Sequence, residues 1–337
     1  PPPAPGPPPE RWFTLPQPRP DVLARLRAAP GDDPVLLGML EAAQTDWDRL
    51  FAPGMLDRLI PPMQVAGLTT GFVLGMPEDE LRRRLGQIAA RGVAFDYAAN
   101  PVIVSGRACG HTEGYDDPRV LAASVERLRR IGVTVRYLSL DGGLFFGHYA
   151  AGGQNCGLDL DETIRDVAIT VNAFKAAWPD VVVGEILPTV PLTREADWQA
   201  SVRAYRDGLA RATGKTLAFF ELDIAWDNPG WRQSVVAETL LAHRLGAGIA
   251  FIYNGDGEDR SDAAWLAHAR RNIAEIEGGL NLDPVHVSFA TWNPHPTHIV
   301  GPPGADTLQA LMAYDALPGA RLHLAPGPAA ITGRVTD

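Results

Sequence analysis

Val181-Val-Val-Gly-Glu-Ile-Leu-Pro188 decides the fold of this chain, because it is an apolar run that carries one acid, stops at a proline and is flanked by amphipathic helical stretches. Two further segments, Val133–Asp141 and Leu217–Asp223, repeat this arrangement. Strands that alternate with helices predict a parallel sheet, and continuous apolar runs indicate strands buried on both faces. We therefore predict an α/β fold, a (β/α)8 TIM barrel, whose active-site face lies at the carboxyl ends of the strands.

Seven strands can be placed with this pattern, and the eighth cannot. The predicted strands are Met63–Leu68, Val93–Tyr97, Val133–Leu140, Val181–Ile186, Leu217–Asp223, Ile249–Tyr253 and His286–Thr291. The remaining strand either lies upstream within 10–60, or is Arg321–Leu324, or is missing, which leaves the closure of the barrel imperfect. Periodicity alone does not decide between these arrangements.

A proline-rich run, Pro1–Pro9, opens the chain. Such a run favours an extended polyproline conformation that builds no core, so residues 1–20 are predicted to be a linker. The barrel domain is predicted at 21–325, with helices in its first part. Residues 326–337 are interpreted as a linker and the start of a truncated β-sandwich module. The protein is thus expected to be a monomer within a larger multi-domain chain.

Composition argues against two kinds of partner. The chain carries 30 basic and 40 acidic residues, a net charge of −10, which does not suit a nucleic acid. No apolar run approaches the roughly 18 residues that span a bilayer, so no membrane insertion is expected. Neither a phosphate-binding loop nor a metal-binding motif occurs in the sequence, and we predict no cofactor and no metal.

The two cysteines, Cys109 and Cys156, lie in the loops after the predicted second and third strands. Neighbouring loops of a barrel come close together, so the two residues form either a disulfide or two unrelated thiols. We favour the disulfide, which is typical of an oxidising compartment, and therefore expect a secreted or periplasmic protein.

Acids recur where the predicted strands end. Hydrolysis of a glycosidic bond needs two carboxyl groups, one protonated and one ionised. Glu185 is the predicted general acid, because desolvation after an apolar strand raises the pKa of a carboxyl group. Asp223 is its predicted partner, and Asp141 is a third catalytic candidate, although Asp-Gly is also a common turn sequence.

Polar and aromatic side chains near other strand ends suit the binding of a carbohydrate. Trp292 can stack on a pyranose face, and Asn254 can hydrogen-bond to a hydroxyl, although Asn-Gly is also an ordinary turn. The predicted substrate-binding residues are Glu113, His148, Glu221, Trp226, Tyr253, Asn254, Trp292 and His295.

Six segments near the strand ends are distinctive: Gly67-Leu-Thr-Thr-Gly-Phe72, Cys109-Gly-His-Thr-Glu-Gly114, Leu144-Phe-Phe-Gly-His148, Leu222-Asp-Ile-Ala-Trp226, Ile252-Tyr-Asn-Gly255 and Trp292-Asn-Pro-His-Pro296. Together they resemble exported bacterial barrel proteins of the glycoside hydrolase superfamily. The resemblance spans about 60–318. It implies a barrel that acts on glycans, without indicating which sugar.

Two sites depart from the pattern of that superfamily. Its members tend to carry Asp-Glu-Pro where this chain has Asp141 followed by Gly142 and Gly143, and an acid where it has Leu187. If those acids are catalytic in the relatives, this chain has either moved its chemistry or lost it.

Three functions are therefore compared. The favoured prediction is a secreted glycoside hydrolase that cleaves a polysaccharide or oligosaccharide by two-carboxylate acid/base catalysis. The alternative, favoured by the two departures, is a barrel that binds glycans without cleaving them. A lyase or isomerase is the third, but it needs a lysine, tyrosine or metal base, and the lysines are only Lys175 and Lys215.

Overall fold

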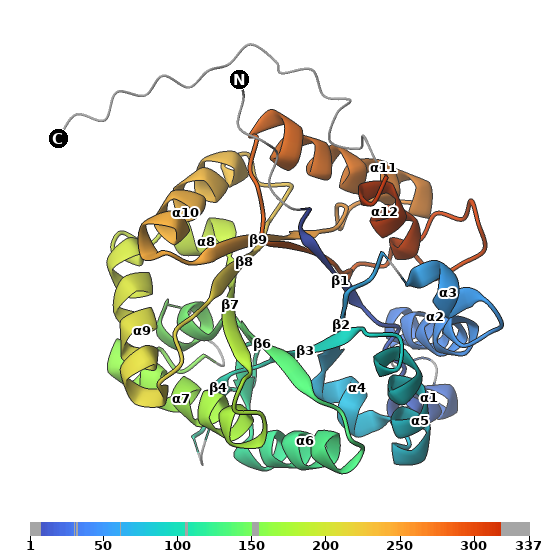
Figure 1. Ribbon diagram of the computed structural model, residues 1–337, viewed down its shortest axis with the longest axis horizontal. Helices are drawn as coiled ribbons and strands as arrows, with labels where there is room; N and C mark the ends of the chain where they lie inside the picture. The colour runs from blue at the N-terminus through green and yellow to red at the C-terminus, as the bar shows by residue number, and fades with distance from the viewer. Residues whose placement is uncertain are drawn as a thin grey trace.

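Eight parallel strands close into a barrel, and helices surround it (Figure 1). The computed structural model describes residues 8–29, 31, 33–60, 62–104, 107–149 and 155–317. The barrel strands are β1 (Glu10–Thr14), β2 (Val65–Thr69), β3 (Ala94–Ala99), β6 (Val135–Asp141), β7 (Val182–Pro188), β8 (Phe219–Asp223), β9 (Gly248–Tyr253) and β10 (His286–Phe289). The predicted TIM barrel is confirmed.

Strand β1 closes the barrel between β10 and β2. Trp12 pairs with Ser288 on one side and with Val65 on the other, both in parallel register. The eighth strand therefore lies upstream, and the expectation of imperfect closure is wrong. The predicted linker at 1–20 is also too long, because its second half contains this strand and Pro20 begins the first helix.

Some predictions concern parts of the chain outside the described residues. They are the first seven residues of the predicted linker, the strand proposed at Arg321–Leu324 and the β-sandwich start at 326–337. The linker and module therefore stay predictions.

Helices cover the outside of the barrel (Figure 1). Three of them, α1–α3, stand between β1 and β2 and fill the region that the sequence predicts to be helical. Within the described ranges, no helix combines the length and the apolar character that crossing a membrane requires. The helices are α1 (Pro20–Ala28), α2 (Pro34–Leu50), α3 (Met55–Leu59), α4 (Thr70–Gly75), α5 (Glu78–Ala89), α6 (Pro118–Arg130), α7 (Leu160–Ala177), α8 (Thr189–Thr193), α9 (Trp198–Thr213), α10 (Trp231–Leu245), α11 (Asp262–Ile273) and α12 (Leu308–Asp315), with π-helical turns at Phe145–Tyr149 and Ala274–Gly279.

An aromatic layer fills the inside of the barrel near the amino ends of the strands. The Trp12 indole stacks on His286 with ring centroids 3.8 Å apart, and it also meets Tyr137 at 4.6 Å and Phe219 at 5.5 Å. Side chains alternate between the two faces of a strand, so the residues two places further along face the same interior. Any cavity inside the barrel must therefore lie above this layer, toward the carboxyl ends.

A disulfide between Cys109 and Cys156 joins the loops that follow β3 and β6. The first loop also contains the short parallel pair β4 (Val102–Ile103) and β5 (Tyr115–Asp116). The Tyr115 hydroxyl donates to the carbonyl of Phe146 at 2.7 Å, and the Cys156 amide donates to the same hydroxyl at 3.3 Å. The predicted disulfide is confirmed, and it ties the two loops together above one side of the barrel.

Candidate active site

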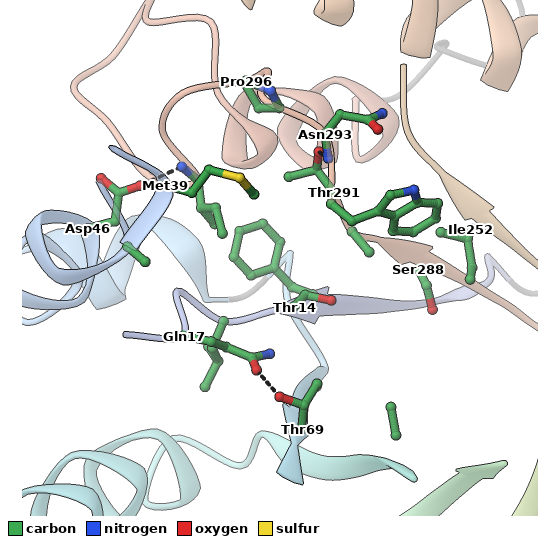
Figure 2. Close-up of a pocket in the computed structure, with 18 of the residues that line it drawn as sticks. Thr14, Gln17, Met39, Asp46, Thr69, Ile252, Ser288, Thr291, Asn293 and Pro296 are labelled. Carbon is green, nitrogen blue, oxygen red and sulfur yellow. Dashed lines mark hydrogen bonds between the residues drawn. The ribbon is translucent and has the colours of Figure 1, made fainter. Parts of the chain in front are cut away.

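A cavity of about 860 Å³ opens at the carboxyl ends of the strands (Figure 2). Its floor is the aromatic layer, represented by Trp12, and its walls come from the strands, from α2 and from the segment after β10. No lysine or arginine is found among the described residues that line it. Five carboxyl groups face it from β3, β6, β8 and the loop before β5: Asp96, Glu113, Asp141, Glu221 and Asp223.

Asp141 and Asp223 are the last residues of β6 and β8, and both are half-buried. Burial raises the pKa of Asp141 to about 7, and the charges of Glu113, Asp223 and Glu221 add to the effect. Burial likewise raises the pKa of Asp223 to about 7, together with the charges of Glu113 and Glu221. Two carboxyl groups that repel each other cannot readily both be ionised, so the pair shares protons near neutral pH.

Asp96 and Glu221 lie deeper in the cavity. Asp96 accepts a hydrogen bond from the Ser139 hydroxyl at 2.9 Å, and burial, reinforced by the charge of Glu221, raises its pKa well above the ordinary range. Glu221 lies 3.5 Å from Nε2 of His286, the histidine that stacks on the Trp12 indole. These contacts hold the two deeper carboxyl groups in place against the floor.

Two glycines set the path of the chain directly after Asp141. Gly142 has a φ of +63°, and a Cβ there would lie 2.4 Å from the Phe146 ring. A Cβ on Gly143 would lie 2.7 Å from the Tyr205 hydroxyl. Gly142 combines a positive φ with a lack of space for a Cβ atom, and only glycine satisfies both conditions. A glutamate at position 142 would therefore strain this backbone and collide with the Phe146 ring.

Glu185 does not face the cavity, contrary to the prediction. Its neighbour Ile186 lines the cavity, so Glu185 points to the outer face of β7. There it is fully buried, and it accepts hydrogen bonds from the Leu144 amide at 2.9 Å and the Tyr205 hydroxyl at 3.1 Å. Burial raises its pKa to about 8. Leu187 shares this outer face, so an acid at that position would not face the cavity either.

Five of the predicted binding residues are also absent from the cavity lining: His148, Trp226, Tyr253, Asn254 and His295. His148 lies against its own loop, with Nδ1 2.9 Å from the carbonyl of Leu158. Trp226 packs edge-on against Trp231 at the start of α10, with ring centroids 5.0 Å apart. Both side chains therefore organise loops beside the cavity.

The other three also lie outside the cavity lining. The Tyr253 hydroxyl donates to Glu277 at 3.0 Å, because this residue lies on the outer face of β9. The Asn254 side chain is buried, with 2% of the residue exposed. Nδ1 of His295 lies 2.5 Å from the carboxylate of Asp262. Among the predicted binding residues, Glu113, Glu221 and Trp292 do line the cavity.

Two parts of the cavity were not predicted from the sequence. Asp96 stands in the middle of a strand, so the search for acids at strand ends misses it. Ala98, two places further along, also lines the cavity, and residues two places apart on a strand share a face. Trp12 comes from the region predicted to be a linker, and the α2 wall comes from the region for which only helices were predicted. The apolar residues Trp12 and Phe13, with Leu15 two places after Phe13, are the signal for a strand at that place.

Comparison with known proteins gives fold likeness only. No family model matches the chain, and no curated protein matches it. Solved structures of similar fold include a GH53 catalytic domain from Ignisphaera aggregans (11% identity, 69% of this chain and 75% of that one, TM-score 0.45). Others are a xylanase from Paenibacillus barcinonensis (11%, 74% and 86%, 0.48) and a putative deoxyribose-phosphate aldolase from Coccidioides immitis (10%, 69% and 72%, 0.37). Glycoside hydrolases are thus among the similar folds, beside enzymes of other reaction classes, and function must be argued from the cavity.

Proposed function

We propose that this protein is a glycoside hydrolase whose catalytic pair is Asp141 and Asp223. The observation that carries the proposal is the position of these two strand-end carboxyl groups in one cavity, each with its pKa raised to about 7. Glycoside hydrolysis requires a protonated and an ionised carboxyl group on either side of the scissile bond. A pair that shares protons near neutral pH supplies both forms at once.

Asp141 is the proposed acid, because its burial and the negative charges of Glu113 and Asp223 favour its protonated form. It would donate its proton to the glycosidic oxygen as the bond to the anomeric carbon breaks. Asp223 would act in its ionised form, either by attacking the anomeric carbon or by activating a water molecule for that attack. Both residues are the last of their strands, and a strand end holds a catalytic group more rigidly than a free loop does.

The remaining lining residues suit a neutral sugar. Trp292 is 52% exposed at the rim of the cavity, where an indole face can stack on a pyranose ring. Glu113 and Glu221 supply acceptors for sugar hydroxyls, and the loop that carries Glu113 is fixed by the disulfide at Cys109. The same disulfide supports the extension of the proposal to a secreted or periplasmic protein. That it is a monomer within a longer chain stays a prediction.

The test is product release from a broad panel of polysaccharides and simple glycosides, followed by mass spectrometry. Asp141→Asn and Asp223→Asn should each lower kcat by at least about a thousandfold, because each removes a group that acts in the transition state. Glu185→Gln should keep kcat within a few-fold, because this side chain lies outside the cavity. Asp180→Asn is the matched control, since it makes the same change at an exposed residue just before β7, at the opposite end of the barrel.

Three outcomes separate the alternatives. Loss of cleavage in both cavity variants, with the Asp180 variant unchanged, supports the pair. Loss of cleavage in Glu185→Gln alone would return the acid role to Glu185 and contradict the proposal. Saturable glycan binding without cleavage of any panel member would favour the barrel that binds but does not hydrolyse.

A further inference from the structure

One wall of the cavity is apolar and open to solvent. It is formed by α2, where Val35 is 60% exposed, Leu36 36% and Met39 37%. Met39 lies four places after Val35 and three after Leu36, so the three side chains form a single stripe along the helix. Trp292 and Pro294, from the segment after β10, also line the cavity. Figure 2 shows Met39 on the α2 side and Asn293 and Pro296 on the side of that segment.

This wall does not suit a second sugar ring. Valine, leucine and methionine side chains offer no strong partners for hydroxyl groups, so a sugar placed there would give up hydrogen bonds with water without replacing them. An alkyl or aryl group placed there would instead be removed from water, which is favourable in proportion to the apolar area covered. The chemistry of the wall therefore favours an apolar group.

The polar groups of α2 near the wall are already engaged. Asp46 accepts hydrogen bonds from the Ile299 amide at 2.5 Å and from Arg49 at 2.8 Å, and its carboxylate lies 3.0 Å from Nδ1 of His298. These contacts bind α2 to the segment after β10 (Figure 2). At the start of the helix, the Asp33 carboxylate accepts from the Leu36 amide at 2.9 Å. The wall is thus a fixed surface beside the carboxyl groups.

The opposite side of the cavity restricts the charge of the ligand. Five carboxyl groups line it, and no lysine or arginine does among the described lining residues. A phosphate, sulfate or uronate group would meet like charges without a counter-charge. At about 860 Å³ the cavity lies toward the upper end of the range for small-molecule sites, so it accepts more than one sugar ring.

We propose that the substrate is an uncharged glycoside with an apolar aglycone, which lies along the α2 stripe while the sugar stacks on Trp292 and meets Asp141 and Asp223. This proposal rests on the proposed hydrolase function. It identifies Leu36 and Met39 as the residues that determine specificity for the aglycone. Water would release the sugar and the free alcohol, with the proton of the acid going to the alcohol oxygen.

The experiment compares n-octyl and methyl glycosides of the same neutral hexoses, below the micelle concentration of the octyl compounds. The two aglycones leave as alcohols of similar acidity, so a difference in kcat/KM reports on binding of the alkyl chain. Burial of three or four methylene groups should favour the octyl glycoside by about a hundredfold. The double variant Leu36→Gln with Met39→Gln should lower kcat/KM for the octyl glycoside at least tenfold more than it lowers kcat/KM for the methyl glycoside.

Leu240→Gln is the matched control, because Leu240 is 53% exposed on α10 and does not line the cavity. Equal cleavage of octyl and methyl glycosides would overturn the aglycone proposal and leave the hydrolase proposal unaffected.

If no glycoside is cleaved, calorimetric titration with the same compounds separates the two proposals. Octyl binding that the double variant abolishes would support the apolar subsite and reject the hydrolase, whereas no binding would reject both. A concentration-dependent dimer that the double variant dissociates would assign the stripe to a second copy and overturn the proposal.

Discussion

The carboxyl groups of Asp141 and Asp223 bind protons more tightly in the folded chain than in an unfolded one. Their pKa rises from 3.8 to about 7 on folding. A group whose folded pKa is raised in this way destabilises the fold once the unfolded chain can ionise it. The free energy of unfolding should therefore fall as the pH rises from about 4 to about 7, and then level off.

Asp223→Asn should remove part of this dependence. An amide carries no charge, so the variant should gain up to about 4 kcal/mol in the free energy of unfolding at pH 8 and little near pH 4. Urea unfolding at the two pH values measures the difference, with Asp180→Asn as the control at an exposed site. An equal change at both pH values would contradict the raised pKa.

The second prediction concerns Glu185, whose buried carboxyl group accepts hydrogen bonds from Leu144 and Tyr205. Its pKa of about 8 keeps it largely protonated at pH 7, so Glu185→Gln should change the free energy of unfolding by less than about 1 kcal/mol. Glu185→Ala should cost about 2–4 kcal/mol, because it leaves the Leu144 amide and the Tyr205 hydroxyl without their buried acceptor. Chemical unfolding at pH 7 compares the two variants. Equal losses would show that this hydrogen bonding contributes little.

The sequence does not show which face of its strand carries the Glu185 side chain, because the strand is apolar on both faces. In Val182–Pro188 the residues before and after the acid are all apolar, so no alternation shows which face meets the cavity. Glu221 and Asp223 stand two places apart on β8, so alternation along the strand explains why both face the cavity. Asp141 lines the cavity as the last residue of β6, whereas the glycines after it make room for the Phe146 ring and the Tyr205 hydroxyl.

At the scale of elements, the loop after β3 depends on the disulfide between Cys109 and Cys156. It closes a sequence separation of 47 residues, and a link of this kind stabilises a fold by about 2–4 kcal/mol. The double variant Cys109→Ser with Cys156→Ser should lose that amount. It should also raise KM more than it lowers kcat, because Glu113 stands on the loop while Asp141 and Asp223 stand on strands.

Unfolding with and without a reducing agent measures this effect. The reducing agent should destabilise the parent chain and leave the double serine variant unchanged. A variant with unaltered stability and unaltered KM would show that the loop holds its position through Tyr115 and Phe146 alone.

Seven strands and most helices follow from the sequence, because their apolar runs and periodicities are long. The first strand did not, for a physical reason: β1 has only five residues, Glu10–Thr14, and prolines stand on both sides of it. Short elements carry little periodicity, and their pairing energy comes from distant neighbours such as Ser288 and Val65. Local signals therefore favoured a linker where closure of the sheet required a strand.

At the scale of the molecule, two tryptophans separate the closure of the barrel from the proposed recognition at its mouth. Trp12 is 4% exposed and joins β1 to the aromatic layer, whereas Trp292 is 52% exposed at the rim. Trp12→Ala should cost about 3–5 kcal/mol, because it leaves a void where His286 and Tyr137 now pack. Trp292→Ala should change the free energy of unfolding by less than about 0.5 kcal/mol but weaken substrate binding. Urea unfolding paired with KM measurements compares the two truncations. A large loss of stability from the Trp292 change, or none from the Trp12 change, would contradict this separation of closure from recognition.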